Sequence, residues 1–132
     1  DNYLTKVPKY GSFLLFQNME RAIRLQTAKG LDLRIIAKSR LVGFWYEHPE
    51  TEQPLKAWHN IAKTANWQSP LDVTNNLRTV KAVSKDRVRF EICGGNYRLI
   101  VAFKFSANIA FVKFIGTHKE YDRVDAKTVS QF

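Results

Sequence analysis

The stretch Asp86–Asp122, DRVRFEICGGNYRLIVAFKFSANIAFVKFIGTHKEYD, decides the fold of this chain. It contains three runs rich in Val, Ile, Phe and Tyr, which are residue types that favour β-strands. Gly94-Gly95-Asn96 separates the first two runs, and Ser106-Ala107-Asn108 separates the second run from the third. Both separating segments have the composition of turns. The pattern predicts an antiparallel meander of three strands.

The two faces of this meander differ in character. Side chains alternate along a strand, and a hairpin with a two-residue loop pairs positions whose numbers sum to an odd value. This parity predicts an apolar face made of Val88, Phe90, Ile92, Tyr97, Leu99, Val101, Phe103, Ala110, Val112 and Phe114. The other face carries five cations and one carboxylate among Arg87, Arg89, Glu91, Arg98, Ile100, Ala102, Lys104, Phe111, Lys113 and Ile115. We expect helices to cover the apolar face and water or an anion to meet the cationic one.

Composition is typical of a soluble globular protein with an excess of positive charge. Its 132 residues are enough for one domain with a hydrophobic core, and 45% of them are hydrophobic. There are 21 Lys and Arg against 12 Asp and Glu, which gives a net charge of +9. This imbalance points to a polyanionic partner, and a basic surface kept for solubility is the alternative.

The single cysteine, Cys93, excludes an internal disulfide framework and leaves no cysteine and histidine spacing of the zinc type. No apolar run approaches the roughly 18 residues that span a bilayer, and we find no signal-peptide layout. We therefore expect a cytoplasmic protein with no metal, no cofactor and no membrane contact.

The chain divides into three predicted parts. Residues 1–30 form an N-terminal extension, partly helical or flexible, in which Phe13–Lys29 has an apolar stripe that ends at Gly30. Residues 31–125 form the domain, and residues 126–132 form a C-terminal tail.

Upstream of the meander, the pattern predicts a strand and two helices. Leu31–Ala37 is the strand, and Ser39 is expected to cap a helix that runs to His48. A second helix should begin at Pro54 and run to about Ala65, with an apolar stripe of Leu55, Trp58, Ile61 and Ala62. A helical turn over Ser69–Asp72 and a strand over Thr79–Val83 follow. The predicted fold is α+β, with a helical hairpin packed on a twisted antiparallel sheet and with cover supplied by Phe44, Trp45, Trp58 and Trp67.

The segment after the last predicted strand has the residue types for cleaving a phosphodiester. Metal-free cleavage of RNA must remove a proton from the 2′-hydroxyl, stabilise an anionic phosphorane and protonate the leaving 5′-oxygen. His118 or Tyr121 could move the protons, and Arg98, Lys104 and Lys119 could hold the charge. The structural alternative is that His118 and Tyr121 only cap the sheet.

Three strings of this sequence resemble HigB-type toxins of bacterial type II toxin–antitoxin systems, which belong to the RelE/ParE superfamily. They are LRIIAKSRLVGFWYEHPETEQPLKAW (Leu33–Trp58), YRLIVAFKF (Tyr97–Phe105) and IAFVKFIGTHKEYDRVDA (Ile109–Ala126). The segment GTHKEYD is the most specific of these, and residues 1–30 fall outside the likeness. The resemblance implies a RelE-like fold and an mRNA interferase that cuts messages on translating ribosomes. It also implies a HigA-type helix-turn-helix antitoxin, through which alone the toxin would reach operator DNA.

Carried onto this sequence, the resemblance implies that the catalytic residues are His118, Tyr121, Arg98 and Lys119. We expect the message backbone to be bound by Lys104, Arg89, Arg87, Lys113 and Arg78. Two other functions stay open: a non-catalytic toxin that inhibits a protein such as DNA gyrase, and a plain RNA- or DNA-binding module.

Other polar residues have structural interpretations. His48 is expected at a helix C-terminus, Cys93 as a small apolar filler, and Glu47, Glu50 and Glu52 as charges at a helix entry. Gly94-Gly95 is a turn and not a phosphate loop, because no helix with Lys-Ser or Lys-Thr follows.

Overall fold

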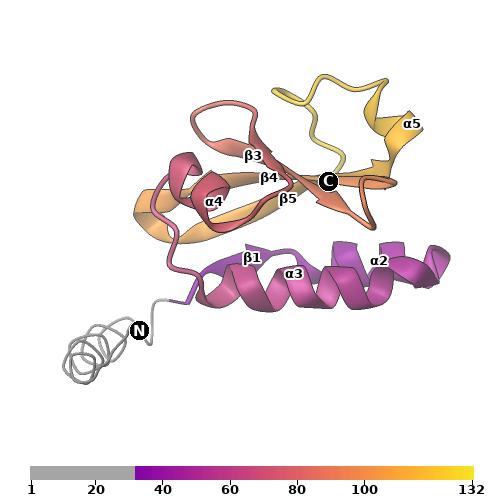
Figure 1. Ribbon diagram of the computed structural model, residues 1–132, viewed down its shortest axis with the longest axis horizontal. Helices are drawn as coiled ribbons and strands as arrows, with labels where there is room; N and C mark the ends of the chain where they lie inside the picture. The colour runs from indigo at the N-terminus through magenta and orange to yellow at the C-terminus, as the bar shows by residue number, and fades with distance from the viewer. Residues whose placement is uncertain (1–31) are drawn as a thin grey trace. The chain divides into compact units, whose positions relative to one another are not determined.

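A five-stranded sheet forms the centre of the computed structural model, which describes residues 32–132 (Figure 1). The predicted helix over Phe13–Lys29 lies outside the described residues. The strands are β1 (Arg34–Ile36), β2 (Val80–Ala82), β3 (Arg87–Ile92), β4 (Tyr97–Lys104) and β5 (Ile109–Thr117). Their order across the sheet is β1-β5-β4-β3-β2. The predicted α+β class and the three-stranded meander β3-β4-β5 are confirmed.

The expectation of a purely antiparallel sheet was wrong. Strand β1 pairs with β5 in parallel, with Arg34 opposite Ile109 and Ile36 opposite Phe111, while the other pairs are antiparallel. The strand is also shorter than the predicted Leu31–Ala37. A parallel neighbour can only be reached by a long crossover, and a three-residue strand carries no sequence signal that specifies its partner.

Four helical segments connect β1 to β2. They are α2 (Lys38–Glu47), the 3₁₀ turn η2 (Pro49–Thr51), α3 (Glu52–Thr64) and α4 (Pro70–Asn76). Helix α2 begins after Ala37, so Ser39 is not its cap. Helix α3 begins at Glu52, and Pro54 lies in its first turn, where the backbone N–H that proline lacks has no helical partner anyway. Ser69 caps α4 by accepting a hydrogen bond from the backbone N–H of Asp72.

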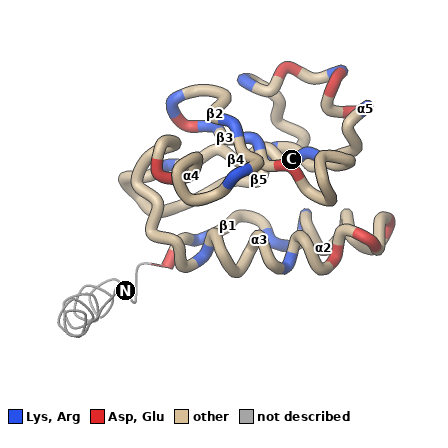
Figure 2. Tube along the Cα trace, in the orientation of Figure 1, with Lys and Arg blue, Asp and Glu red and all other residues tan. Residues whose placement is uncertain are grey.

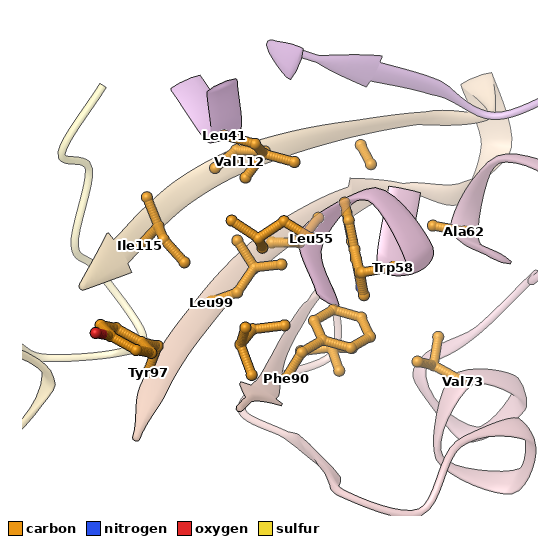
Figure 3. Packing of buried hydrophobic residues seen from close by; sticks show 14 of the residues in the cluster. Leu41, Leu55, Trp58, Ala62, Val73, Phe90, Tyr97, Leu99, Val112 and Ile115 are labelled. Atoms are coloured by element: carbon orange, nitrogen blue, oxygen red, sulfur yellow. The ribbon is translucent and has the colours of Figure 1, made fainter. Parts of the chain in front are cut away.

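The core lies between α2 and α3 and the apolar face of the sheet (Figures 1 and 3). Trp45, Trp58 and Trp67 are buried there, as predicted, and Phe44 packs against the cluster from its margin. Trp58 and Trp67 both contact the ring of Phe90 on β3, with ring centroids 5.3 Å and 6.2 Å away. The predicted place of Ile61 in this stripe was wrong, because 43% of it is exposed.

A β-bulge changes the alternation of side chains in β5. Val101 on β4 pairs with Val112 on β5, but the preceding residue, Ile100, pairs with Phe114. The register therefore shifts by one residue at this point, and Leu99 pairs with Ile115. Ile115 therefore joins the core, and Phe114 lies on the cationic face, which reverses the prediction for these two residues. One extra residue in a strand inverts every later position.

The cationic face of the sheet is partly covered by the end of the chain. The helix α5 (His118–Tyr121) follows β5 directly, and α5 and the segment after it lie on the opposite side of the sheet from α2 and α3 (Figure 1). Ile100 and Phe114 are consequently buried although they are outside the main core. The segment after α5 is held by Arg87, whose guanidinium donates to the carbonyls of Ala126 and Val129 at 3.1 Å and 2.8 Å.

Candidate active site

The position of α5 is set by its first residues. The hydroxyl of Thr117 accepts a hydrogen bond from the N–H of Glu120, and the Glu120 carboxylate accepts one from the N–H of Thr117, which together form a capping box. The backbone N–H of His118 donates to the carbonyl of Asn96 in the β3–β4 turn at 2.9 Å. These bonds attach a four-residue helix rigidly to the end of the sheet.

Tyr121 lies against the cationic face of the sheet. The guanidinium carbon of Arg98 on β4 is 5.3 Å from the centroid of the Tyr121 ring, and that of Arg89 on β3 is 5.8 Å away. The ring of Phe114 lies 6.3 Å from the same ring. We call these four residues the Tyr121 cluster. Two guanidinium groups over one aromatic ring make favourable cation–π contacts and concentrate positive charge around the Tyr121 ring.

The two arginines of the Tyr121 cluster are not equivalent. Arg89 forms an ion pair with Glu91 at 3.2 Å, and its side chain is only 17% exposed. Arg98 donates from Nε to the carbonyl of Gly95 at 3.3 Å, and no carboxylate of the described residues forms an ion pair with it. Arg98 is therefore the better placed of the two to receive an anion.

His118 lies at the solvent side of α5. Its Nδ1 is 3.2 Å from a carboxylate oxygen of Asp122, and both side chains are more than half exposed. A carboxylate on one imidazole nitrogen fixes the tautomer and leaves Nε2 available for proton transfer. Lys119 is exposed on the same helix. His118, Lys119 and Tyr121 thus all lie on α5, and of these three Tyr121 is the one that contacts Arg98.

Other predicted cations lie elsewhere. Lys104 is exposed at the far end of β4, six residues from Arg98, which is roughly 20 Å along a strand. Arg87 is engaged with the carbonyls of the C-terminal segment. Lys113 is the extra residue of the bulge, and its Nζ lies 5.6 Å from the centroid of Phe111. Arg78 is exposed just before the edge strand β2. Figure 2 shows basic residues spread over β3 and the β2–β3 connection.

Sequence reasoning missed a polar cluster at the same end of the sheet, made of His48, Glu50 and Tyr97. The hydroxyl of Tyr97 donates to the Glu50 carboxylate, and it lies 3.5 Å from Nδ1 of His48. The His48 ring stacks on that of Phe44 with centroids 4.3 Å apart. We call these three residues the His48 cluster. The signal for it was Tyr97, because a tyrosine predicted on a buried face needs a partner for its hydroxyl.

The hydrogen bond between Tyr97 and Glu50 acts on both groups. It raises the pKa of the Tyr97 phenol to about 12, with burial and the carboxylate charge adding to the effect. The same bond lowers the pKa of the Glu50 carboxyl. Tyr97 therefore stays protonated at physiological pH and acts as a hydrogen-bond donor, which excludes it as a base. Burial also raises the pKa of the Cys93 thiol, as expected for a small packing residue.

The described residues contain neither a metal-binding group of side chains nor a membrane-spanning helix. Within residues 32–132, no three His, Cys, Asp or Glu side chains gather in a way that could hold a metal ion. No helix in this part of the chain is long and apolar enough to cross a membrane.

The segment that contains this arrangement matches a known protein family. The HigB toxin family, described as the RelE-like toxic component of a toxin–antitoxin system, matches residues 51–124, which is more than half of the chain. This chain belongs to the HigB toxin family. The matched segment contains the whole Tyr121 cluster and α5. Comparison with curated proteins gives no match.

As a HigB toxin, the protein works with an antitoxin partner. The matched segment begins at Thr51 and therefore leaves out β1, α2 and two members of the His48 cluster, His48 and Glu50. Within the HigB match, α5 carries an imidazole, an ammonium group and a phenol, and the ring of that phenol contacts the guanidinium of Arg98. We therefore take α5 and Arg98 as the candidate active site.

Proposed function

We propose that this HigB toxin is a metal-independent endoribonuclease, an mRNA interferase that cuts messages on translating ribosomes in the cytoplasm and so inhibits translation. The observation that carries the proposal is the Tyr121 cluster, in which a phenol on α5 lies under the guanidinium of Arg98. His118 is on the same short helix. These residues would supply the groups for proton transfer and for charge stabilisation at one end of the basic sheet.

The proposed reaction is an in-line displacement at phosphorus. One of His118 and Tyr121 takes the proton from the 2′-hydroxyl, whose oxygen forms a bond to phosphorus. The bond from phosphorus to the 5′-oxygen breaks, and the other group supplies a proton to that oxygen. Arg98, assisted by Lys119, stabilises the negative charge on the phosphorane. The products carry a 2′,3′-cyclic phosphate and a 5′-hydroxyl.

The message backbone would extend from this site across the basic strands. Arg89 lies beside Arg98 and adds positive charge at the site. Lys104 and Lys113 are proposed to hold phosphates more distant from the scissile bond, and Arg78 lies at the margin of the sheet. Arg87 contributes through the C-terminal segment that it binds.

The antitoxin is proposed to be of the HigA type, with a helix-turn-helix, and to connect the toxin to operator DNA. A basic face of this kind is silenced by an acidic or electronegative surface, and complementary charge favours fast association. The proposed activity resides in residues 31–125.

The test is induction of wild-type and variant toxin in a bacterial host, followed by mapping of mRNA 5′ ends. Tyr121→Phe removes only the phenolic oxygen, and His118→Gln removes the imidazole. We expect each to reduce cleavage by about 10²- to 10⁴-fold, the usual contribution of one acid–base group. Lys85→Gln is the matched control, because it removes one exposed cation from the β2–β3 connection, to which no role in RNA binding or cleavage is assigned. Its effect should be small.

Cleavage at the wild-type rate by both Tyr121→Phe and His118→Gln would remove α5 from the active site. Growth arrest without new mRNA ends in the wild type would instead refute the nuclease proposal and favour inhibition of a protein target.

A further inference from the structure

A cavity of about 410 Å³ lies between α2, the end of β5, α5 and the last residues of the chain. The rings of Phe44, His48 and Phe132 line it, together with the carboxylates of Glu47 and Glu120. Neither the fold nor the proposed cleavage chemistry uses this cavity. Its size is within the range of small-molecule sites, and its lining combines flat rings with hydrogen-bond acceptors.

Gly43 leaves the backbone of α2 open at the wall of this cavity. It lies inside α2 and lines the cavity, where a glycine weakens a helix by about 1 kcal/mol relative to alanine. A Cβ atom added at Gly43 would meet nothing within 4 Å. Packing of the described residues therefore does not require a glycine here, whereas close approach of a ligand to the helix backbone would.

The charges of the cavity disfavour a phosphate and favour a ligand group that donates hydrogen bonds. Glu47 and Glu120 supply two carboxylates, and the only guanidinium in the lining, that of Arg40, lies over the Phe132 ring at 4.7 Å. One oxygen of Glu120 is already used by the N–H of Thr117. The remaining acceptors suit a ligand that donates from amino groups, and the Phe44–His48 ring stack suits a planar one.

The cavity and the Tyr121 cluster lie on either side of α5. Glu120 lines the cavity, and the next residue, Tyr121, contacts Arg98. Adjacent residues of α5 thus face the cavity and Arg98, and in this arrangement a nucleic acid strand with a phosphate at Arg98 would place a neighbouring base at the cavity. Unpaired RNA bases are commonly recognised by stacking on aromatic and histidine rings together with hydrogen bonds to their edges.

We infer that the cavity between α2 and α5 binds a single unstacked RNA base that carries an exocyclic amino group. The inference rests on the proposed function, because it assigns a base subsite to the same message. Phe44 and His48 form the wall against which the base packs, Gly43 allows it to approach α2, and Glu47 accepts a hydrogen bond from its amino group. Uracil, which has no exocyclic amino group, is the base that fits worst.

The experiment measures binding of the full chain to a single-stranded tetraribonucleotide that is 2′-O-methylated throughout, so that it cannot be cut. The same oligonucleotide is prepared with one abasic position at a time and with uracil at each position. Gly43→Leu fills the cavity, and Asn60→Leu is the control because it adds the same side chain at an exposed position of α3. Gly43→Ala should raise the midpoint temperature of thermal unfolding, which would show that position 43 tolerates a side chain.

We expect Gly43→Leu to weaken binding of the intact oligonucleotide about tenfold, within the range of one stacked base. Binding of one abasic oligonucleotide should not change. Glu47→Gln should remove the discrimination against uracil at that same position. Saturation with the intact oligonucleotide should also shift the amide NMR signals of Gly43 and Glu120.

An equal loss of affinity for intact and abasic oligonucleotides, or no loss at all, would overturn the inference. An amide NMR signal of Gly43 that does not shift on saturation with the intact oligonucleotide would also overturn the inference. These outcomes are separate from those of the cleavage test, because mRNA cutting in cells would continue in a toxin that has no base subsite. Conversely, binding of the modified oligonucleotide is measured without any cleavage.

Discussion

The guanidinium of Arg98 lies over the ring of Tyr121, with 5.3 Å between the guanidinium carbon and the ring centroid. Arg98 is on β4 opposite Gly116 of β5, and Tyr121 is on the helix that follows β5. The contact exists because Gly116 has no side chain and because the bulge in β5 places Phe114 on this face, where it supports the Tyr121 ring.

Arg98→Met separates the charge of Arg98 from its packing, since methionine still covers the ring. We expect the free energy of unfolding to fall by about 0.5–1 kcal/mol, the size of an exposed cation–π contact, and RNA cleavage to fall by at least tenfold. Urea denaturation and mapping of mRNA ends provide the two measurements. Arg98→Lys keeps the charge and should retain more cleavage than Arg98→Met. Equal cleavage by the wild type and Arg98→Met would show that the guanidinium has no role in the chemistry.

Gly116→Ala should displace α5. A Cβ atom at this position would lie 2.7 Å from the ring of Phe114 and 2.7 Å from a carboxylate oxygen of Glu120, so the ring and the capping box must both move. We expect a loss of about 1–3 kcal/mol in the free energy of unfolding, as for overpacking in a core, together with loss of cleavage.

The control for Gly116→Ala is Gly43→Ala, at a glycine whose added Cβ meets nothing within 4 Å. It should increase the free energy of unfolding by up to about 1 kcal/mol. Denaturation midpoints that move in the same direction for both variants would contradict the assignment of Gly116 to a tight contact.

Arg87→Gln should release the C-terminal segment from the sheet. The arginine donates two charge-assisted hydrogen bonds, to Ala126 and Val129, and bonds of this class contribute about 1.5–3 kcal/mol each to a folded structure. Amide hydrogen exchange of residues 124–131 should become faster while exchange in β4 stays unchanged. Lys85→Gln, the loss of an exposed cation in the β2–β3 connection, serves as the control. Unchanged exchange in the segment after Arg87→Gln would mean that Gln131 alone holds it, through its contacts with Lys113 and Ile115.

Tyr97→Phe should remove a late-titrating phenol. Its hydrogen bond to Glu50 raises the pKa of Tyr97 from 10.0 to about 12, so the folded protein holds this proton more tightly than the unfolded chain does. The stabilisation is complete below pH 10 and is lost as the pH rises through 12.

Ultraviolet absorbance titration should show one of the five tyrosines ionising late, and this step should be absent in Tyr97→Phe. Tyr46→Phe, at a residue that is 78% exposed, should keep it. Persistence of the late step in Tyr97→Phe would refute the Tyr97–Glu50 hydrogen bond.

The meander and the composition of α5 could be predicted because they follow from local patterns. Alternation of apolar and polar residues predicted β3, β4 and most of β5, and the helix α3 followed from Pro54 and the apolar stripe after it. Phe114 and Ile115 were placed on the wrong faces because a bulge depends on the pairing of two strands and leaves no mark in one of them. Alternation gives the face of a residue but not its neighbours. It therefore could not predict that Arg87 binds the C-terminal segment or that Lys104 lies far from Tyr121.

By itself, the amino-acid sequence determined the α+β class, the excess of positive charge near the last strands, and the residues of the segment from Thr117 to Asp122 that could move protons. Only the tertiary structure decided that Arg98, and not Lys104, meets Tyr121, and that His48, Glu50 and Tyr97 form a cluster. The physical reason is that residue types follow from local chemistry, whereas a contact between distant residues depends on strand register, on a bulge and on where a helix ends. A shift of one residue in any of these moves a side chain to the opposite face of the sheet.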